Sequence, residues 1–309
     1  MDSRQRLIDN VARQCGPSVV VLNLGVGEVQ ACERSAPMVT SHPRGAFTDI
    51  DRSADPGGFV RILDALTALD FIRAYKRRTF ELLDLQPGAS VLDLGCGTGD
   101  DVQELARLVG PSGRVVGVDS SETVIAEACE RVLRTTLRVA FQVADAYALP
   151  FPDATFDACR ADRVFHHLEH PRQAFRELLR VVRPGGRALL FDPDFETAIV
   201  DAPDRALTRR LLNFYCDGYR DGWMGRRLPG LFREAGLTEI TVEPVPVLLT
   251  DLAQANVVLA LEDTVTRAAA TGLVDGVEGT AWLDALRTAS GQGQFFAAIT
   301  AFMVMGRKL

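Results

Sequence analysis

The pattern of apolar and polar positions predicts alternating strands and helices over residues 90–191. Short apolar runs alternate there with stretches in which apolar residues fall on one helical face. Such alternation is typical of a parallel sheet covered by helices on both sides. Helices are expected to start near Asp100, Ser121, Pro152 (a short one) and Pro171. Five strands are expected, at Ser90–Leu94, Arg114–Val118, Arg138–Val143, Phe156–Arg160 and Arg187–Phe191.

The segment before this pattern is harder to interpret. Residues 1–55 contain one short apolar run, Val19–Leu22, among Gly, Pro and polar residues, so we predict a poorly ordered segment or flap. Met38 is an alternative start of the chain. Order is expected from near Phe59, with two helices that end before Pro87. We therefore predict one main domain over residues 56–309.

The last third changes character. The pattern predicts helices at Arg205–Tyr215 and Arg226–Ala235, then an edge or bent strand at Thr238–Leu249 because it contains two prolines. Two more helices, Asp251–Thr271 and Glu278–Ala289, form a helical insertion over 251–290 before a final strand, Gln294–Met305. The expected fold is a doubly wound, mostly parallel α/β sheet of seven strands with helical N-terminal and C-terminal lid elements.

Composition narrows the class of protein. The 309 residues are 47% hydrophobic and 24% charged, as in globular proteins, and the net charge of −7 disfavours nucleic-acid binding. Six cysteines form no CxxC pair, which favours reduced thiols and a cytoplasmic location. The longest apolar run, Phe295–Met305, is too short for a bilayer span, and the first residues lack the order of a secretory signal. Membrane insertion is not expected.

A glycine loop is the sharpest chemical feature. The apolar strand Val91–Leu94 leads directly into Gly95, Gly97 and Gly99, and a helix follows. Glycines allow a tight turn and the close approach of a ligand. A nicotinamide dinucleotide site is one alternative, but its third glycine comes one position later, and the adjacent Asp100-Asp101 would repel a pyrophosphate. Those carboxylates suit a ligand that has a positive centre and no phosphate.

Two acidic residues end the next two strands. Asp119 can accept hydrogen bonds from both hydroxyls of a ribose, and Asp145 from an adenine amino group. The alternative is that each aspartate only caps the following helix. Together with Asp93, they mark three successive strand ends, where α/β sheets bind ligands.

The run Leu92–Gly99, followed by Val118-Asp119, Asp145, Leu149-Pro150-Phe151, Phe156-Asp157 and Leu179–Gly186, resembles class I S-adenosylmethionine-dependent methyltransferases of the UbiE/type-11 branch. The resemblance implies methyl transfer from S-adenosyl-L-methionine to a small organic acceptor, such as a natural product or a quinone-like metabolite. It implies that Gly95, Cys96, Gly97 and Gly99 line the methionine part of the cofactor, and that Asp93 shapes the loop and neighbours the ammonium group of the cofactor. It also implies Asp119 and Ser120 at the ribose, and Asp145 and Ala146 at the adenine.

A histidine-rich loop follows the fourth strand. His166 or His167 is a candidate base, because an imidazole titrates near neutral pH, and Asp192 is a second base or an orienter. The spacing of the histidines lacks a metal-binding signature, so no metal is expected. Arg163 is a candidate for the cofactor carboxylate or a substrate anion, or it forms an ion pair with Asp162 or Glu169.

Aromatic residues suggest where the acceptor binds. We expect Tyr75, Phe195, Tyr215 and Tyr219 to contact the substrate, although ordinary core packing explains them equally well. The helical insertion over 251–290 is expected to be a lid or the surface of a homodimer. Two other functions remain open: a protein that binds the cofactor without methylating, as a binding module or a cyclisation catalyst, and a nicotinamide-dependent oxidoreductase.

Overall fold

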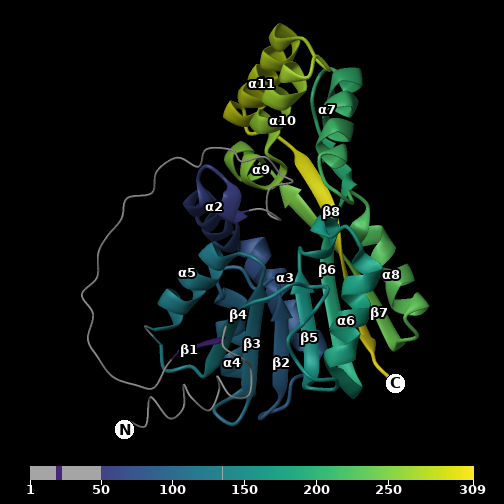
Figure 1. Cartoon of the computed structure of the whole chain (residues 1–309). Helices are drawn as coiled ribbons and strands as arrows, with labels where there is room; N and C mark the ends of the chain where they lie inside the picture. The colour runs from purple at the N-terminus through teal and green to yellow at the C-terminus, as the bar shows by residue number, and fades with distance from the viewer. Residues whose placement is uncertain (1–18, 23–49, 134) are drawn as a thin grey trace.

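A twisted sheet with helices on both faces forms the body of the molecule (Figure 1). The computed structural model describes residues 19–22, 50–133 and 135–309. The strand order is β1-β4-β3-β2-β5-β6-β8-β7. Strands β2 to β6 run parallel, and β8 lies antiparallel between β6 and β7. The strands are β1 Val19–Leu22, β2 Ser90–Leu94, β3 Arg114–Asp119, β4 Val139–Val143, β5 Phe156–Asp162, β6 Val182–Val200, β7 Thr238–Leu249 and β8 Ala297–Arg307.

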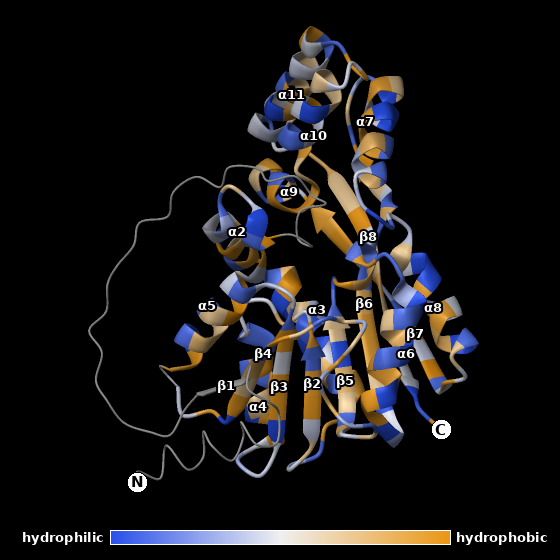
Figure 2. Cartoon of the chain, viewed as in Figure 1, coloured by the Kyte–Doolittle hydropathy of each residue, from blue (hydrophilic) through white to orange (hydrophobic). Residues whose placement is uncertain are grey.

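The seven predicted strands are confirmed, and β1 adds a short eighth strand antiparallel to β4. Both faces of the parallel strands are buried, which explains their continuous apolar sequence (Figure 2). Along β2, Val91 packs in one core and Leu92 in the other. Since successive strand residues point to opposite faces, Asp93 lies on the same face as Val91.

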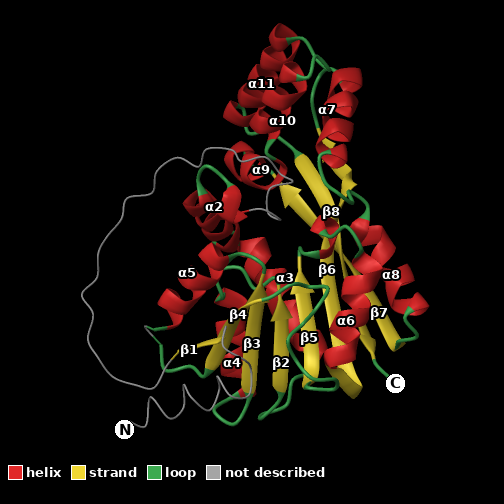
Figure 3. Cartoon of the chain, viewed as in Figure 1, coloured by secondary structure: helices red, strands yellow, loops and turns green. Residues whose placement is uncertain are grey.

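Helices α3, α4 and α5 cover the face of Val91, and α6 and α8 cover the face of Leu92. A third core joins α7, α9, α10 and α11 to the far ends of β6, β7 and β8, beyond the rest of the sheet (Figure 3). The helices are α2 Pro56–Thr67, α3 Asp70–Leu83, α4 Asp100–Val109, α5 Glu122–Val132, α6 Pro171–Val181, α7 Arg205–Asp217, α8 Met224–Glu234, α9 Leu252–Leu259, α10 Leu261–Ala270 and α11 Gly276–Gly291, with the short 3-10 helices η2 Ile50–Arg52 and η3 Phe165–His167.

Some local predictions were wrong. The short helix expected near Pro152 is a turn, because Ala154 has a φ of 53° and the Thr155 hydroxyl donates to the Pro152 carbonyl oxygen at 2.6 Å. The single helix expected over 251–271 breaks into α9 and α10 at Ala260, whose φ is 39°. The predicted flap lies mostly outside the described residues; of it, the structure describes β1 and residues 50–55.

Candidate active site

A cavity of about 620 Å³ opens at the carboxyl ends of the parallel strands, below α2 and α9. The loop after β2 forms part of its wall through Gly95, Cys96 and Gly97. Gly95 has a φ of 70°, and a Cβ there would lie 2.3 Å from Val164 Cγ2, so the close packing of this loop requires glycine. Gly99 does not line the cavity; its N–H donates to the Cys96 carbonyl oxygen at 3.0 Å and closes the turn before α4.

The two predicted ribose and adenine carboxylates both line this cavity, together with Ser120 and Ala146. Asp119 Oδ2 accepts the Gly97 N–H at 3.0 Å, and Oδ1 accepts the Ser121 N–H at 3.1 Å. Burial raises the pKa of the Asp119 carboxyl. The N-cap of α5 is Ser121, so Asp119 does not cap the helix itself but joins the glycine loop to the cap residue. Because each carboxylate oxygen has further lone pairs, Asp119 can still accept ligand hydroxyls.

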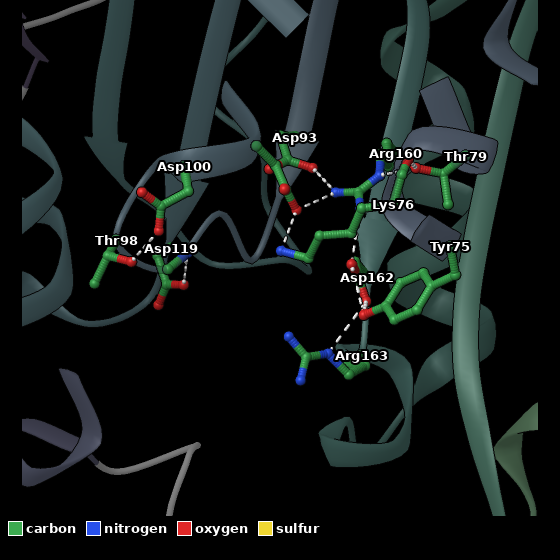
Figure 4. Close-up of polar contacts among 12 residues, drawn as sticks. Tyr75, Lys76, Thr79, Asp93, Thr98, Asp100, Asp119, Arg160, Asp162 and Arg163 are labelled. Carbon is green, nitrogen blue, oxygen red and sulfur yellow. Dashed lines mark hydrogen bonds and ion pairs between the residues drawn. The ribbon is translucent and has the colours of Figure 1, made fainter. Parts of the chain in front are cut away.

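A buried cluster of charges lies behind the glycine loop (Figure 4). Arg160, on β5, has no exposed surface. Its Nη1 lies 3.0 Å from an oxygen of Asp93 and 3.0 Å from an oxygen of Asp101. Its Nη2 lies 2.7 Å from Asp162 Oδ2, and its Nε donates to the Thr79 hydroxyl at 2.9 Å. This one guanidinium therefore joins α3, α4, β2 and β5.

This cluster changes the expected role of two acidic residues. Asp93 is 2% exposed and does not line the cavity, because Arg160 holds it beneath the loop. It therefore supports the loop from behind instead of facing a ligand. Asp101 lies 2.8 Å from Lys76 Nζ as well as contacting Arg160, so its charge is balanced within the protein. Only Asp100 of the predicted pair lines the cavity without a place in this cluster.

The two carboxyls that contact Nη1 of Arg160 have opposite pKa shifts. Burial raises the pKa of Asp93 to about 7. Burial acts in the same direction on Asp101, but Arg160 and Lys76 outweigh it and lower the pKa of Asp101 to about 2. Asp101 therefore keeps its charge at neutral pH, whereas Asp93 takes up a proton readily. Sequence reasoning missed Arg160, because a strand residue gives no signal of its partners on other elements.

Arg163 and Tyr75 both contact Asp162 of the buried charge cluster, and both line the cavity. The Arg163 Nε donates to Asp162 Oδ1 at 3.3 Å, as one of the two predicted alternatives requires. Its Nη atoms point away from Asp162 (Figure 4). The Tyr75 hydroxyl lies 3.1 Å and 3.2 Å from the two oxygens of Asp162. Arg163 has a φ of 59°, a strained conformation for a side chain of this size.

His166 and Asp192 form a buried pair at the cavity wall. His166 lies in η3 and lines the cavity, whereas Asp192, on β6, has no exposed surface and lies behind it. The Nδ1 atom of His166 contacts Asp192 Oδ1. The backbone N–H groups of Phe165 and His166 donate to Asp192 at 3.2 Å and 3.4 Å. Asp192 therefore holds the His166 ring and the start of η3 in place and does not itself line the cavity.

Burial governs the ionisation of this pair. It lowers the pKa of His166 to about 3 and raises that of Asp192 well above its ordinary value. The imidazole is therefore neutral at neutral pH. When the Asp192 carboxylate accepts from Nδ1–H, the other ring nitrogen, Nε2, is an acceptor.

The other histidines of the loop differ in their positions. The His167 ring lines the cavity at 3.8 Å from the His166 ring, centroid to centroid, and burial lowers its pKa well below the ordinary value. His170 is exposed and faces Tyr147, 6.1 Å away between ring centroids. Within the described ranges, no group of three or more His, Cys, Asp or Glu side chains is arranged to hold a metal ion.

The four predicted aromatic residues all line the cavity. The rings of Phe195 and Tyr219 stack with centroids 3.5 Å apart, and His166 meets both of them edge-on. Tyr215 meets the Phe195 ring edge-on at 5.6 Å. The sequence did not reveal that α2 and α9 close the opposite side with Leu63, Leu66, Val257 and Val258.

None of the helices within the described ranges combines the length and the apolar character needed to cross a bilayer.

Comparisons with known proteins agree with this geometry. Residues 91–186 match the family model of a methyltransferase domain. An uncharacterised 37.1 kDa protein in transposon TN4556 of Streptomyces fradiae is 38% identical over 249 residues, which are 80% of this chain and 71% of that protein. The ubiquinone/menaquinone biosynthesis C-methyltransferase UbiE of Ectopseudomonas mendocina is 39% identical over 122 residues, which are 39% of this chain and 48% of UbiE. The chain thus aligns with about half of the length of UbiE.

Among solved structures, the [4+2]-cyclase SpnF has a TM-score of 0.50 and 24% identity, covering 78% of this chain and 83% of the cyclase. That similarity concerns the fold. The chain belongs to the class I S-adenosylmethionine-dependent methyltransferases, enzymes whose cofactor is S-adenosyl-L-methionine. The resemblance noted in the sequence is confirmed.

Proposed function

We propose that the protein transfers a methyl group from S-adenosyl-L-methionine to a small, largely apolar organic acceptor, and that His166 removes the proton of the acceptor. The His166–Asp192 pair at the cavity wall carries this proposal. A base adds about 10²- to 10⁴-fold to a reaction that requires loss of a proton.

The cofactor would bind along the strand ends. Gly95, Cys96 and Gly97 would lie against its methionine part, and the Nη atoms of Arg163 would face its carboxylate. Asp119 with Ser120 would accept from the ribose, and Asp145 with the Ala146 N–H would bind the adenine. The donor set fits, because carboxylates border the cavity where hydroxyl and amino groups would lie, and the phosphate-repelling Asp100 is harmless to this cofactor.

The bound cofactor supplies a methyl group made electrophilic by the positive sulfur atom. The protein holds the acceptor beside it, which is worth several kcal/mol, about 7–11 at best. Asp192 holds the Nδ1–H tautomer of His166, so that Nε2 takes the proton of an acceptor hydroxyl or of an acidic C–H group. Asp192, when ionised, then stabilises the imidazolium that forms by accepting its Nδ1–H.

The lining of the acceptor side favours an apolar molecule with a flat surface. Phe195, Tyr215 and Tyr219 present aromatic rings, and α2, α9 and β8 present aliphatic side chains. Aromatic rings in offset or edge-on packing favour another aromatic surface. A weakly acidic phenol or enol therefore matches both the walls and the base.

Methyl transfer to a panel of phenols and enols, followed by mass spectrometry, tests the proposal. We expect His166→Ala to slow turnover by about 10²- to 10⁴-fold while the affinity for S-adenosylhomocysteine stays close to wild type. His170→Ala is the matched control, because His170 is exposed and does not line the cavity. Equal rates in the three proteins would mean that the reaction proceeds by alignment alone.

A second candidate is a protein that binds the cofactor and catalyses cyclisation, since a cyclase shares the fold. Binding of S-adenosylhomocysteine without methyl transfer to any acceptor would favour it. Binding of NADH, and not of S-adenosylhomocysteine, would instead favour the oxidoreductase.

We also expect a cytoplasmic location, supported by the four free cysteines of the described ranges, and propose a homodimer as the oligomeric state to test.

A further inference from the structure

The end of the cavity opposite the glycine loop is built by elements of the third core (Figure 1). Strands β7 and β8 contribute Val247, Ile299 and Ala301, and helix α9 contributes Asn256, Val257 and Val258. Among the described residues that β7, β8, α9 and α10 give to this cavity, Asp263 on α10 is the one charged side chain. A carboxylate in a largely apolar wall is costly unless something pairs with it.

Asp263 lacks the hydrogen bonds that normally accompany a buried carboxylate. Its side chain is 10% exposed, and Oδ2 is buried with no hydrogen-bond donor among the described residues. Its one charged neighbour in those ranges is Arg267, with Nη1 at 3.6 Å from Oδ2, beyond hydrogen-bond distance. Buried polar side chains are satisfied in most native structures, so an unsatisfied one that lines a ligand cavity needs an explanation.

The position of Asp263 in its helix does not explain why this carboxylate is buried without a hydrogen bond. Asp263 lies in the first turn of α10, where a negative charge is favourable. However, Asp251 and Asp275, at the starts of α9 and α11, accept backbone N–H groups there, whereas Asp263 accepts none. Arg267 has a second contact, with its guanidinium 5.5 Å from the centre of the Phe214 ring, so Asp263 is not needed to hold it.

We propose that Asp263 is a specificity residue, which binds a hydrogen-bond donor on the part of the acceptor remote from the methylated atom. This inference rests on the proposed methyl transfer and deepens it. The acceptor is then an apolar molecule with two polar ends: a weakly acidic group at His166, and a hydroxyl or an ammonium group at Asp263. The helical insertion thereby selects the acceptor, while the strand ends hold the cofactor.

Four probes test this assignment: a naphthol with no second polar group, and the same naphthol carrying a hydroxyl, a methoxyl or an aminomethyl group on the opposite ring. The measured quantity is kcat/KM of each substituted naphthol divided by that of the plain naphthol. In the wild type we expect this ratio to be high for the hydroxyl or the aminomethyl compound and low for the methoxyl compound, which donates no hydrogen bond.

Asp263→Leu should lower the ratio of the preferred donor compound by about 10- to 100-fold, the scale of one buried hydrogen bond to a charged group. Asp263→Asn separates the two donors. The kcat/KM ratio of the aminomethyl compound should fall as far as in Asp263→Leu, whereas the ratio of the hydroxyl compound should fall less. Glu262→Gln is the matched control. It removes one negative charge at the neighbouring position of α10, and Glu262 is exposed. It should leave the ratio unchanged.

Thermal unfolding of the ligand-free protein separates this role from a structural one. If Asp263 binds a ligand and does not stabilise the fold, Asp263→Asn does not lower Tm. If the Asp263–Arg267 ion pair stabilises the fold, Asp263→Asn and Arg267→Met both lower Tm by more than about 4 °C. That result, or a donor ratio that is the same in wild type and Asp263→Leu, overturns the inference. If the wild type methylates none of the naphthols, the proposed acceptor class fails, and the unfolding data alone decide for or against a ligand role of Asp263.

Discussion

Replacement of Arg160 by methionine is the most direct test of the buried charge cluster. Methionine keeps much of the side-chain volume but removes the guanidinium that contacts Asp93, Asp101 and Asp162 (Figure 4). All three carboxyls have little exposed surface, so water cannot replace the lost partner. We expect Arg160→Met to be strongly destabilising, because Lys76 and Arg163 are then the remaining cations that pair with these carboxyls among the described residues.

The size of the expected loss in stability follows from the burial of Arg160 and its partners. Removing one partner of a buried ion pair costs about 3–5 kcal/mol in the free energy of unfolding. For a protein of this size, that corresponds to a fall in Tm of roughly 6–10 °C. Neutralising one of the stranded carboxyls should recover part of this loss, so the double variant Arg160→Met/Asp93→Asn should be more stable than Arg160→Met alone. Arg107→Met is the control, since Arg107 is half exposed and its one ion-pair partner among the described residues is Glu104.

The pH dependence gives the cluster a second signature. Burial already raises the folded-state pKa of Asp93 to about 7, and in Arg160→Met the guanidinium no longer opposes this rise. A group shifted in this direction destabilises the folded protein when it is charged, and the penalty disappears as pH falls below the raised pKa. The difference in unfolding free energy between wild type and Arg160→Met should therefore be large near pH 8 and smaller near pH 5.5.

Urea unfolding at both pH values, followed by circular dichroism, measures these differences. The result that would refute the reasoning is a loss below about 1 kcal/mol in Arg160→Met, which is the ordinary range for an exposed ion pair. A loss that is the same at both pH values would also refute it, because the stranded carboxyls would then not be its cause.

Four other changes follow from the site. Asp119→Ala should weaken S-adenosylhomocysteine binding by roughly 1–3 kcal/mol in calorimetry, because ribose hydroxyls lose their acceptor. Asp192→Asn should lower kcat with little change in cofactor affinity, because the orientation of His166 is lost; an unchanged kcat would contradict this role. Asp51→Asn should lower Tm at neutral pH, because Asp51 accepts the Ser121 hydroxyl and the backbone N–H groups that start α5. These hydrogen bonds outweigh burial and lower the pKa of Asp51 from 3.8 to about 2, so the difference should shrink as pH falls below about 4 and approaches 2. Treatment with a chelator should leave methyl transfer unchanged; restoration by a divalent ion after a loss would identify a metal requirement.

Much of the fold was predictable because its signals are local. The parallel strands are apolar on both faces, and the glycine loop, its following helix and the acidic strand ends occur at fixed spacing. His166 and Asp192 were predicted as partners because both follow neighbouring strands. Their different positions were not predicted, because the sequence does not show that His166 lines the cavity while Asp192 lies behind it.

The remaining features depend on contacts between distant segments. Arg160 looked like an ordinary strand residue, and only the tertiary structure brings three carboxyls from separate elements around it. Nothing in the sequence pointed to a role for Asp263, and only the packing of α10 in the third core places this side chain in the interior. The break at Ala260 escaped notice because alanine is the best helix former and gives no sign of a left-handed turn.

The placement of β8 has a consequence for the order in which the molecule forms. Among the described strands, β7 has β8 as its one partner, and β8 follows it only after the whole helical insertion. During synthesis, the strands from β2 to β6 can pair as they emerge, but β7 waits unpaired until β8 has left the ribosome. The end of the cavity that the third core lines is thus assembled last, onto strands β2 to β6 that are already in place.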